Sequence, residues 1–142
     1  MFHCVKLSEG ASGMTFVFRG VDHVQLAAYE SCEPEARAFF GGVLGWPEIA
    51  KPDSLRARGG VWFQCGVHQV HIGVQKDFVP AVKAHPAFEV GGLDELIAHL
   101  EERGVPVIPD DARDAENVRR TYINDPFGNR IEFLEWGKRG DE

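Results

Sequence analysis

The stretch NDPFGNRIEFLEW, residues 124–136, decides how this chain folds. Its first six residues gather Asn, Asp, Pro and Gly, a composition typical of a tight turn. The remainder alternates, because Ile131 and Phe133 have one parity and Glu132 has the other, and this pattern predicts a strand with two different faces. Arg119–Ile123 predicts another strand just before the turn.

Three stretches upstream alternate in the same way. In each, one histidine has the parity opposite to the apolar residues: His23 in residues 21–29, His71 in residues 69–74 and His85 in residues 83–90. A half-buried strand packs its apolar parity and leaves the other parity on the far face of the sheet. We therefore expect three more strands, each with a histidine on the face that does not pack on a helix.

Two helices are predicted between these strands. Apolar residues recur at helical spacing over about 33–44, where Pro34 lies near the start and Gly45 is placed to end the helix. A second apolar stripe covers about 93–103 and is closed by Gly104. The remaining short strands are expected within Asp53–Gly60, at Val61–Cys65 and at Val105–Ile108.

The two halves of the chain repeat one pattern. His23 and His71 are 48 residues apart, and His85 and Glu132 are 47 residues apart. Each half reads strand, helix and three strands, so we predict an α+β fold of two βαβββ modules related by pseudo-two-fold symmetry. The modules would form a cup-shaped, partly open mixed β-barrel. The predicted boundaries are a loose leader (1–15), module 1 (about 16–77), module 2 (about 78–136) and a tail (137–142).

A metal site is the prediction that follows from the four residues at matching repeat positions. His23, His71, His85 and Glu132 all have the cup-facing parity, and three imidazoles with a carboxylate suit divalent Zn, Ni, Co, Mn or Fe. Gln69 is the alternative to His71 on the same face. A single strand histidine is more often a hydrogen-bonding residue than a ligand, and Glu132 alone could be solvated. Four such residues at repeat positions favour the metal.

Aromatic and cationic side chains near the cup are candidates for substrate contacts. Trp62 and Tyr122 occupy similar places in the two halves and line either the cup or the core, whereas Trp136 shares the parity of Glu132. Arg119 and Arg120 are adjacent, so only one faces inward. We assign Arg120 to the cup, where it would bind a carboxylate or phosphonate group.

Composition excludes several classes of function. The 142 residues fit one domain, and a net charge of -7 with no Lys/Arg cluster argues against nucleic-acid binding. No apolar run approaches the ~20 residues that cross a bilayer, so no membrane partner is expected. Three cysteines without close pairing indicate free thiols and a cytoplasmic protein. Cys65 is expected to be a small core residue.

Several of these stretches resemble the vicinal oxygen chelate superfamily, which includes glyoxalases, bleomycin resistance proteins and extradiol dioxygenases. Residues 21–26 (VDHVQL) resemble its opening strand, residues 39–45 its first helix and residues 125–132 (DPFGNRIE) its last hairpin. The resemblance covers about 16–136. It implies that Glu132 is a metal ligand, with the others on the first and last strands of each half. His71 stands where glyoxalase I carries Glu or another polar ligand, and this chain lacks that enzyme's longer glutathione-binding elements.

The resemblance leaves several functions open. We favour a metal-dependent enzyme of the lyase or isomerase type, in which the metal chelates vicinal oxygens of a small oxygenated metabolite and Glu132 moves a proton. The alternative is a metal-free binding protein that sequesters a flat ligand on Trp62, Tyr122 and Trp136. A thiol transferase and a dioxygenase are further alternatives. We expect a homodimer, and the sequence does not say whether one chain or two enclose the cup.

Overall fold

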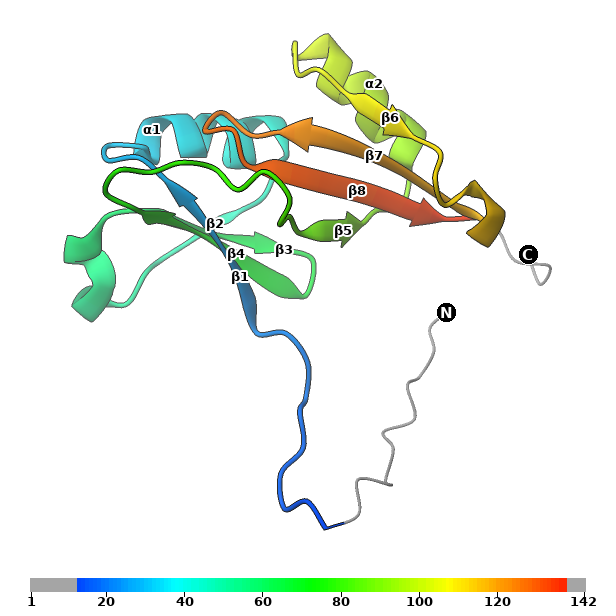
Figure 1. Ribbon diagram of the computed structural model, residues 1–142. Coiled ribbons are helices and arrows are strands. Elements are labelled where there is room, and N and C mark those ends of the chain that lie inside the picture. Colours follow the sequence, from blue (N-terminus) through cyan, green and yellow to red (C-terminus); the bar gives the residue numbers. More distant parts are fainter. Residues whose placement is uncertain (1–12, 138–142) are drawn as a thin grey trace.

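Two four-stranded mixed sheets make up the fold in the computed structural model, which describes residues 13–137 (Figure 1). The first sheet has the order β1-β4-β3-β2, with β1 (His23–Ala28), β2 (Glu48–Ile49), β3 (Val61–Cys65) and β4 (His68–Val74). The second has the order β5-β8-β7-β6, with β5 (Ala87–Glu89), β6 (Ile108–Asp110), β7 (Val118–Asn124) and β8 (Arg130–Trp136). Each module pairs its first strand in parallel with its last, and the other pairs are antiparallel.

This arrangement confirms the two βαβββ modules of the predicted α+β fold. The sheets do not close into a barrel within the described part of the chain. Most of the predicted leader and tail, residues 1–12 and 138–142, lies outside the described residues.

Each module has one main helical segment, where the apolar spacing predicts it. In module 1, α1 (Glu33–Ala36) runs directly into a π-helix, η1 (Arg37–Val43), in which the Leu44 N–H donates to Phe39 O, five residues earlier, at 2.9 Å. In module 2, α2 (Leu93–Glu102) ends before Gly104, whose φ of +78° closes the helix. The short 3₁₀ helices η2 (Asp53–Arg58) and η3 (Asp114–Glu116) complete the elements. No helix within residues 13–137 is both long and apolar enough to cross a membrane.

Three strand predictions need correction. The strand expected at Val105–Ile108 lies later along the chain, as β6 (Ile108–Asp110). The short strand expected within Asp53–Gly60 lies earlier, at β2, and residues 53–58 form η2 instead. This segment has no apolar alternation, and Gly59 ends it at a φ of +75°. In module 2, β5 is shorter than the expected 83–90, because Pro86 has no backbone N–H to donate to a ladder.

The hydrophobic core belongs to both modules. Phe40 and Phe63 of module 1 share one buried cluster with Leu100 and Phe133 of module 2. These are residues of the helices and of the helix-facing strand parity, which is the packing parity that the alternation predicts. At the boundary between modules, the ring centroid of Trp46 lies 5.3 Å from that of Phe88 and the His99 ring nitrogen Nε2 is 2.7 Å from Val43 O. The modules are therefore joined through their helix-side residues.

Asp125 organises the turn between β7 and β8. Its buried carboxylate accepts hydrogen bonds from the backbone N–H groups of Phe127 (2.9 Å) and Asn129 (2.8 Å), and from the Asn129 side-chain amide (2.8 Å). The same amide donates to Ala27 O at 2.8 Å and so ties the turn to β1. Burial raises the pKa of Asp125, and these hydrogen bonds act in the opposite direction.

Replacing Asp125 with Ala should therefore destabilise the whole domain. The change leaves two backbone donors of the turn without their acceptor, and we expect the free energy of unfolding to fall by about 3 kcal/mol. Urea denaturation followed by circular dichroism measures this loss. Asn124→Ala at the exposed neighbouring position is the control and should change stability little. An Asp125 variant as stable as the parent would rule out this role for the carboxylate.

Candidate metal centre

Module 1 brings His23 and His71 together on one face of its sheet. They lie on the adjacent strands β1 and β4, and their rings stack with centroids 4.2 Å apart. Trp62, opposite His71 on β3, stacks flat on the other side of the His71 ring at 3.7 Å with an interplanar angle of 2°. The result is a column of three rings that presents two imidazoles.

His71 is the buried member of this column, with 5% of its surface exposed, whereas His23 is exposed. Burial lowers the pKa of His71, and the neighbouring His23 adds to the effect. The lowered pKa favours the neutral ring, which is the protonation state that a metal ligand needs. Its Nε2 atom lies 2.9 Å from Gln69 Oε1, so Gln69 orients His71 in this structure and stands beside it as the predicted alternative ligand.

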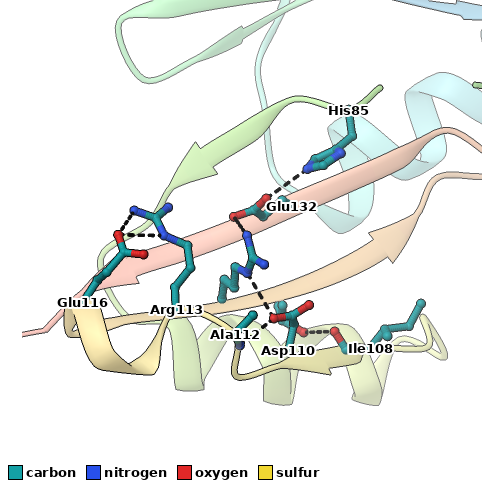
Figure 2. Close-up of polar contacts among 9 residues, drawn as sticks. His85, Ile108, Asp110, Ala112, Arg113, Glu116 and Glu132 are labelled. Atoms are coloured by element: carbon teal, nitrogen blue, oxygen red, sulfur yellow. Dashed lines mark hydrogen bonds and ion pairs between the residues drawn. The ribbon is translucent and has the colours of Figure 1, made fainter. Parts of the chain in front are cut away.

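Module 2 brings His85 and Glu132 together. His85 Nε2 contacts Glu132 Oε1 (Figure 2), at a distance of 3.0 Å. The Glu132 side chain is only 5% exposed. His85 precedes β5 and its Nδ1 is 2.9 Å from Lys83 O, while Glu132 lies on β8. The other Glu132 oxygen, Oε2, is 3.7 Å from Arg120 Nη1. Glu132 is thus a buried carboxylate between an imidazole and a guanidinium.

The structure resolves which of the adjacent arginines faces this pair. Arg120 lies on the Glu132 face, and its Nε also donates to Asp110 Oδ1 at 3.2 Å. Arg119 points to the helix side, where its Nη2 is 2.5 Å from Asp94 of α2. The assignment of Arg120 to the site face agrees with this geometry, and its contact with a substrate stays a prediction.

The four predicted ligands form two pairs and not one group within a single chain. Among residues 13–137, no cluster of three or more His, Cys, Asp or Glu side chains could hold a metal ion. Each pair nevertheless has donors that suit a divalent metal, two imidazoles in one and an imidazole with a carboxylate in the other. The donor atoms therefore suit the predicted ion, but each of the two pairs in one chain provides only two of the four ligands.

The predicted aromatic residues lie around these pairs. Tyr122 is buried opposite Glu132 on β7, with its ring edge-on to His85 at 5.3 Å between centroids. Burial and the nearby Glu132 charge raise the pKa of Tyr122. Trp136 is 36% exposed at the end of β8, with the Arg113 guanidinium 5.3 Å above its ring. Cys65 is half-buried, and burial raises the pKa of its thiol, as expected for a packing residue.

Sequence reasoning missed Arg130. This residue lies on β8 two positions before Glu132, and its guanidinium sits 4.0 Å above the Tyr122 ring centroid. The signal was present, because residues two apart on a strand point to the same face of a sheet.

Comparison with known proteins agrees with this architecture. The sequence model of the Glyoxalase/Bleomycin resistance protein/Dioxygenase superfamily matches residues 20–133. A glyoxalase family protein from Bacillus anthracis is similar at 52% identity and a TM-score of 0.83, over 86% of this chain and 98% of that one.

Two more distant structures share the fold. A lactoylglutathione lyase from Agrobacterium tumefaciens has 21% identity and a TM-score of 0.65, over 83% of this chain and 94% of that one. A genomically encoded fosfomycin resistance protein from Listeria monocytogenes has 18% identity and a TM-score of 0.65, over 87% and 95%. The family model matches most of the chain, and the two modules agree with it. This chain therefore belongs to the Glyoxalase/Bleomycin resistance protein/Dioxygenase superfamily.

Proposed function

We propose that this protein is a metal-dependent enzyme of the glyoxalase type, a lyase or isomerase that acts on a small oxygenated metabolite. The observation that carries the proposal is the contact of half-buried His85 with buried Glu132 at 3.0 Å, on the same sheet face as Arg120. Burying a carboxylate is costly unless it has partners, and a divalent metal is a partner that this donor set suits. When bound, a divalent ion would supply Lewis-acid polarisation of two neighbouring substrate oxygens.

The proposal places the complete site between two copies of the chain. Within one chain the modules are joined by helix-side residues, so the faces that carry the two ligand pairs are left for another partner. We infer that the His23–His71 pair of one copy faces the His85–Glu132 pair of the other in a homodimer. A two-fold dimer makes two such sites, each with four protein ligands.

The segment that leads into β1 supports this assembly. Residues 14–21 extend away from the body of the molecule (Figure 1), and Phe18 is 86% exposed, Phe16 62% and Val21 62%. Apolar side chains this exposed on a segment that ends next to His23 are unfavourable in water. A second copy seated on the module 1 face would lie beside this segment and cover it.

The protein's own side chains then divide the work. His23, His71, His85 and Glu132 hold the ion, and the Trp62 ring limits the movement of His71 by stacking on it. Arg120 holds Glu132 from the side opposite His85 and orients its carboxylate toward the site. We assign Glu132 to accept and return the substrate proton, because it is the carboxylate among the four ligand candidates. The unpaired thiols of Cys32 and Cys65 support a cytoplasmic location.

Two measurements on protein purified without a chelator or a nickel column test the proposal together. Metal analysis should find about one divalent ion per chain, and light scattering should find a dimer of about twice the 15.8 kDa chain mass. Treatment with a chelator should remove the ion and leave the dimer and its circular dichroism in place. A chain of about 16 kDa throughout the micromolar range would contradict the shared site. A dimer that binds no divalent metal would favour the metal-free sequestering protein.

A further inference from the structure

Arg130 lies on the same sheet face as Glu132, and the proposed function gives it no role. Its side chain is half-buried, and its guanidinium carbon lies 4.0 Å from the centroid of the Tyr122 ring. A cation–π contact holds a guanidinium in place and leaves its N–H groups able to donate to another partner.

Three other arginines of this module have carboxylate partners. Arg120 pairs with Asp110 and Glu132, Arg113 pairs with Glu116 at 2.8 Å, and Arg119 pairs with Asp94. Within residues 13–137, Arg130 forms no ion pair and no side-chain hydrogen bond. An oriented guanidinium whose donors are free is a ready site for an oxyanion.

Arg130 and His85 line the same cavity. The cavity has a volume of about 490 Å³ and lies between β1, the segment 75–86 that connects the modules, and the start of β8. Its walls are mostly apolar, from Val24, Leu26, Phe78 and Pro86, and its polar groups include Gln25 and Asn129. A cavity of this size, apolar with a few polar groups, is typical of small-molecule sites.

We propose that Arg130 binds the carboxylate of the substrate, which makes the substrate class a small 2-hydroxy or 2-oxo acid with a short apolar substituent. The inference rests on the proposed function, since the oxygen on the neighbouring carbon is the one that would reach the ion at His85. The planar guanidinium fork matches a carboxylate with two parallel hydrogen bonds. The apolar walls receive the substituent.

The test compares two ligands of nearly the same shape, lactate and lactamide, which differ in the charge that Arg130 would read. NMR titration of the chelator-treated protein should show at least about tenfold tighter binding of lactate, and Arg130→Gln should abolish this preference. Arg130→Lys keeps the charge without the fork and should retain part of it. The matched control Arg119→Gln removes an arginine from the neighbouring strand β7, on the helix side, and should keep the parent's preference. Thermal unfolding checks that every variant is folded.

The outcomes separate this inference from the proposed function. If Arg130→Gln prefers lactate as strongly as the parent does, Arg130 is not the anchor. If inorganic phosphate binds through Arg130 more tightly than lactate does, Arg130 is an anion-binding residue but the substrate is not a carboxylic acid. Titration of the same proteins with Mn²⁺ tests the metal separately: Arg130→Gln should bind Mn²⁺ like the parent, and a parent that binds no Mn²⁺ overturns the proposed function without affecting the lactate comparison.

Discussion

Replacing Glu132 with Gln should weaken Mn²⁺ binding by at least about 100-fold and leave the fold intact. Gln has the shape of Glu and keeps an oxygen that can accept the hydrogen bond from His85, but it removes the negative charge that would compensate a divalent ion. Arg120 keeps its second partner, Asp110, so the variant is not left with an unpaired guanidinium. Mn²⁺ titration followed by electron paramagnetic resonance measures the affinity, and circular dichroism checks the fold.

Glu135→Gln is the matched control, because it removes the same charge from the same strand on the other face. The Glu135 carboxylate accepts hydrogen bonds from the backbone N–H groups of Gly92 and Leu93 at the start of α2, both at 2.9 Å, and these hydrogen bonds lower its pKa. This variant should lose a small part of the domain's stability and none of its Mn²⁺ affinity. Equal Mn²⁺ affinities in the Glu132 variant and the parent would remove Glu132 from the ligand set.

Two variants that each lack one ligand pair, and so bind no metal alone, should recover metal binding when they are mixed. One chain carries His23→Ala and His71→Ala, and the other carries His85→Ala and Glu132→Gln. Each homodimer has a defect at both of its sites. A mixed dimer has one site with both defects and one site with all four ligands, because each site draws one pair from each copy. Random exchange at equal concentrations makes about half of the dimers mixed, so about a quarter of the parent's sites should return.

Exchange is started by unfolding the two chains together in urea and refolding them, and the tight Mn²⁺ sites are then counted. The control is the same treatment of each chain alone, which should give none. A site built within one chain predicts no recovery on mixing, since every chain then lacks one of its own pairs. The recovered fraction therefore decides between the two ways of enclosing the site.

The elements of this fold could be predicted because they follow from local patterns. Alternation identified β1, β4, β7 and β8, and Gly45 and Gly104 follow the helical segments that they were expected to end. Alternation also placed His23 and His71 on one face of their sheet, where their rings stack, since parity is a property of each strand alone. His85 lies before β5, outside the strand that was expected to carry it. The π-helix η1 and the early position of β2 have no comparable local signal.

The division of the ligands into two pairs could not be predicted, for a different physical reason. Parity states which face of a sheet a side chain occupies but not what lies opposite that face. That depends on which surfaces of the two modules are more favourable to bury, and here the aromatic residues of the helix side, such as Phe40 and Phe63, are shared between modules. Arg130 could have been proposed from its parity alone, but its freedom depends on the partners of its neighbours, which only the three-dimensional arrangement reveals.

The parallel pairing of β1 with β4 has a consequence for how the chain is made. A ribosome releases the N-terminus first, and β1 has no partner in its sheet until residues 69–74 have emerged to pair with it. Module 1 can then complete its sheet, but Phe88, Leu100 and Phe133, which share its core, emerge later. The nascent protein consequently exposes the apolar helix side of module 1 while module 2 is translated. This interval is when the chain is most vulnerable to aggregation and has most to gain from a chaperone.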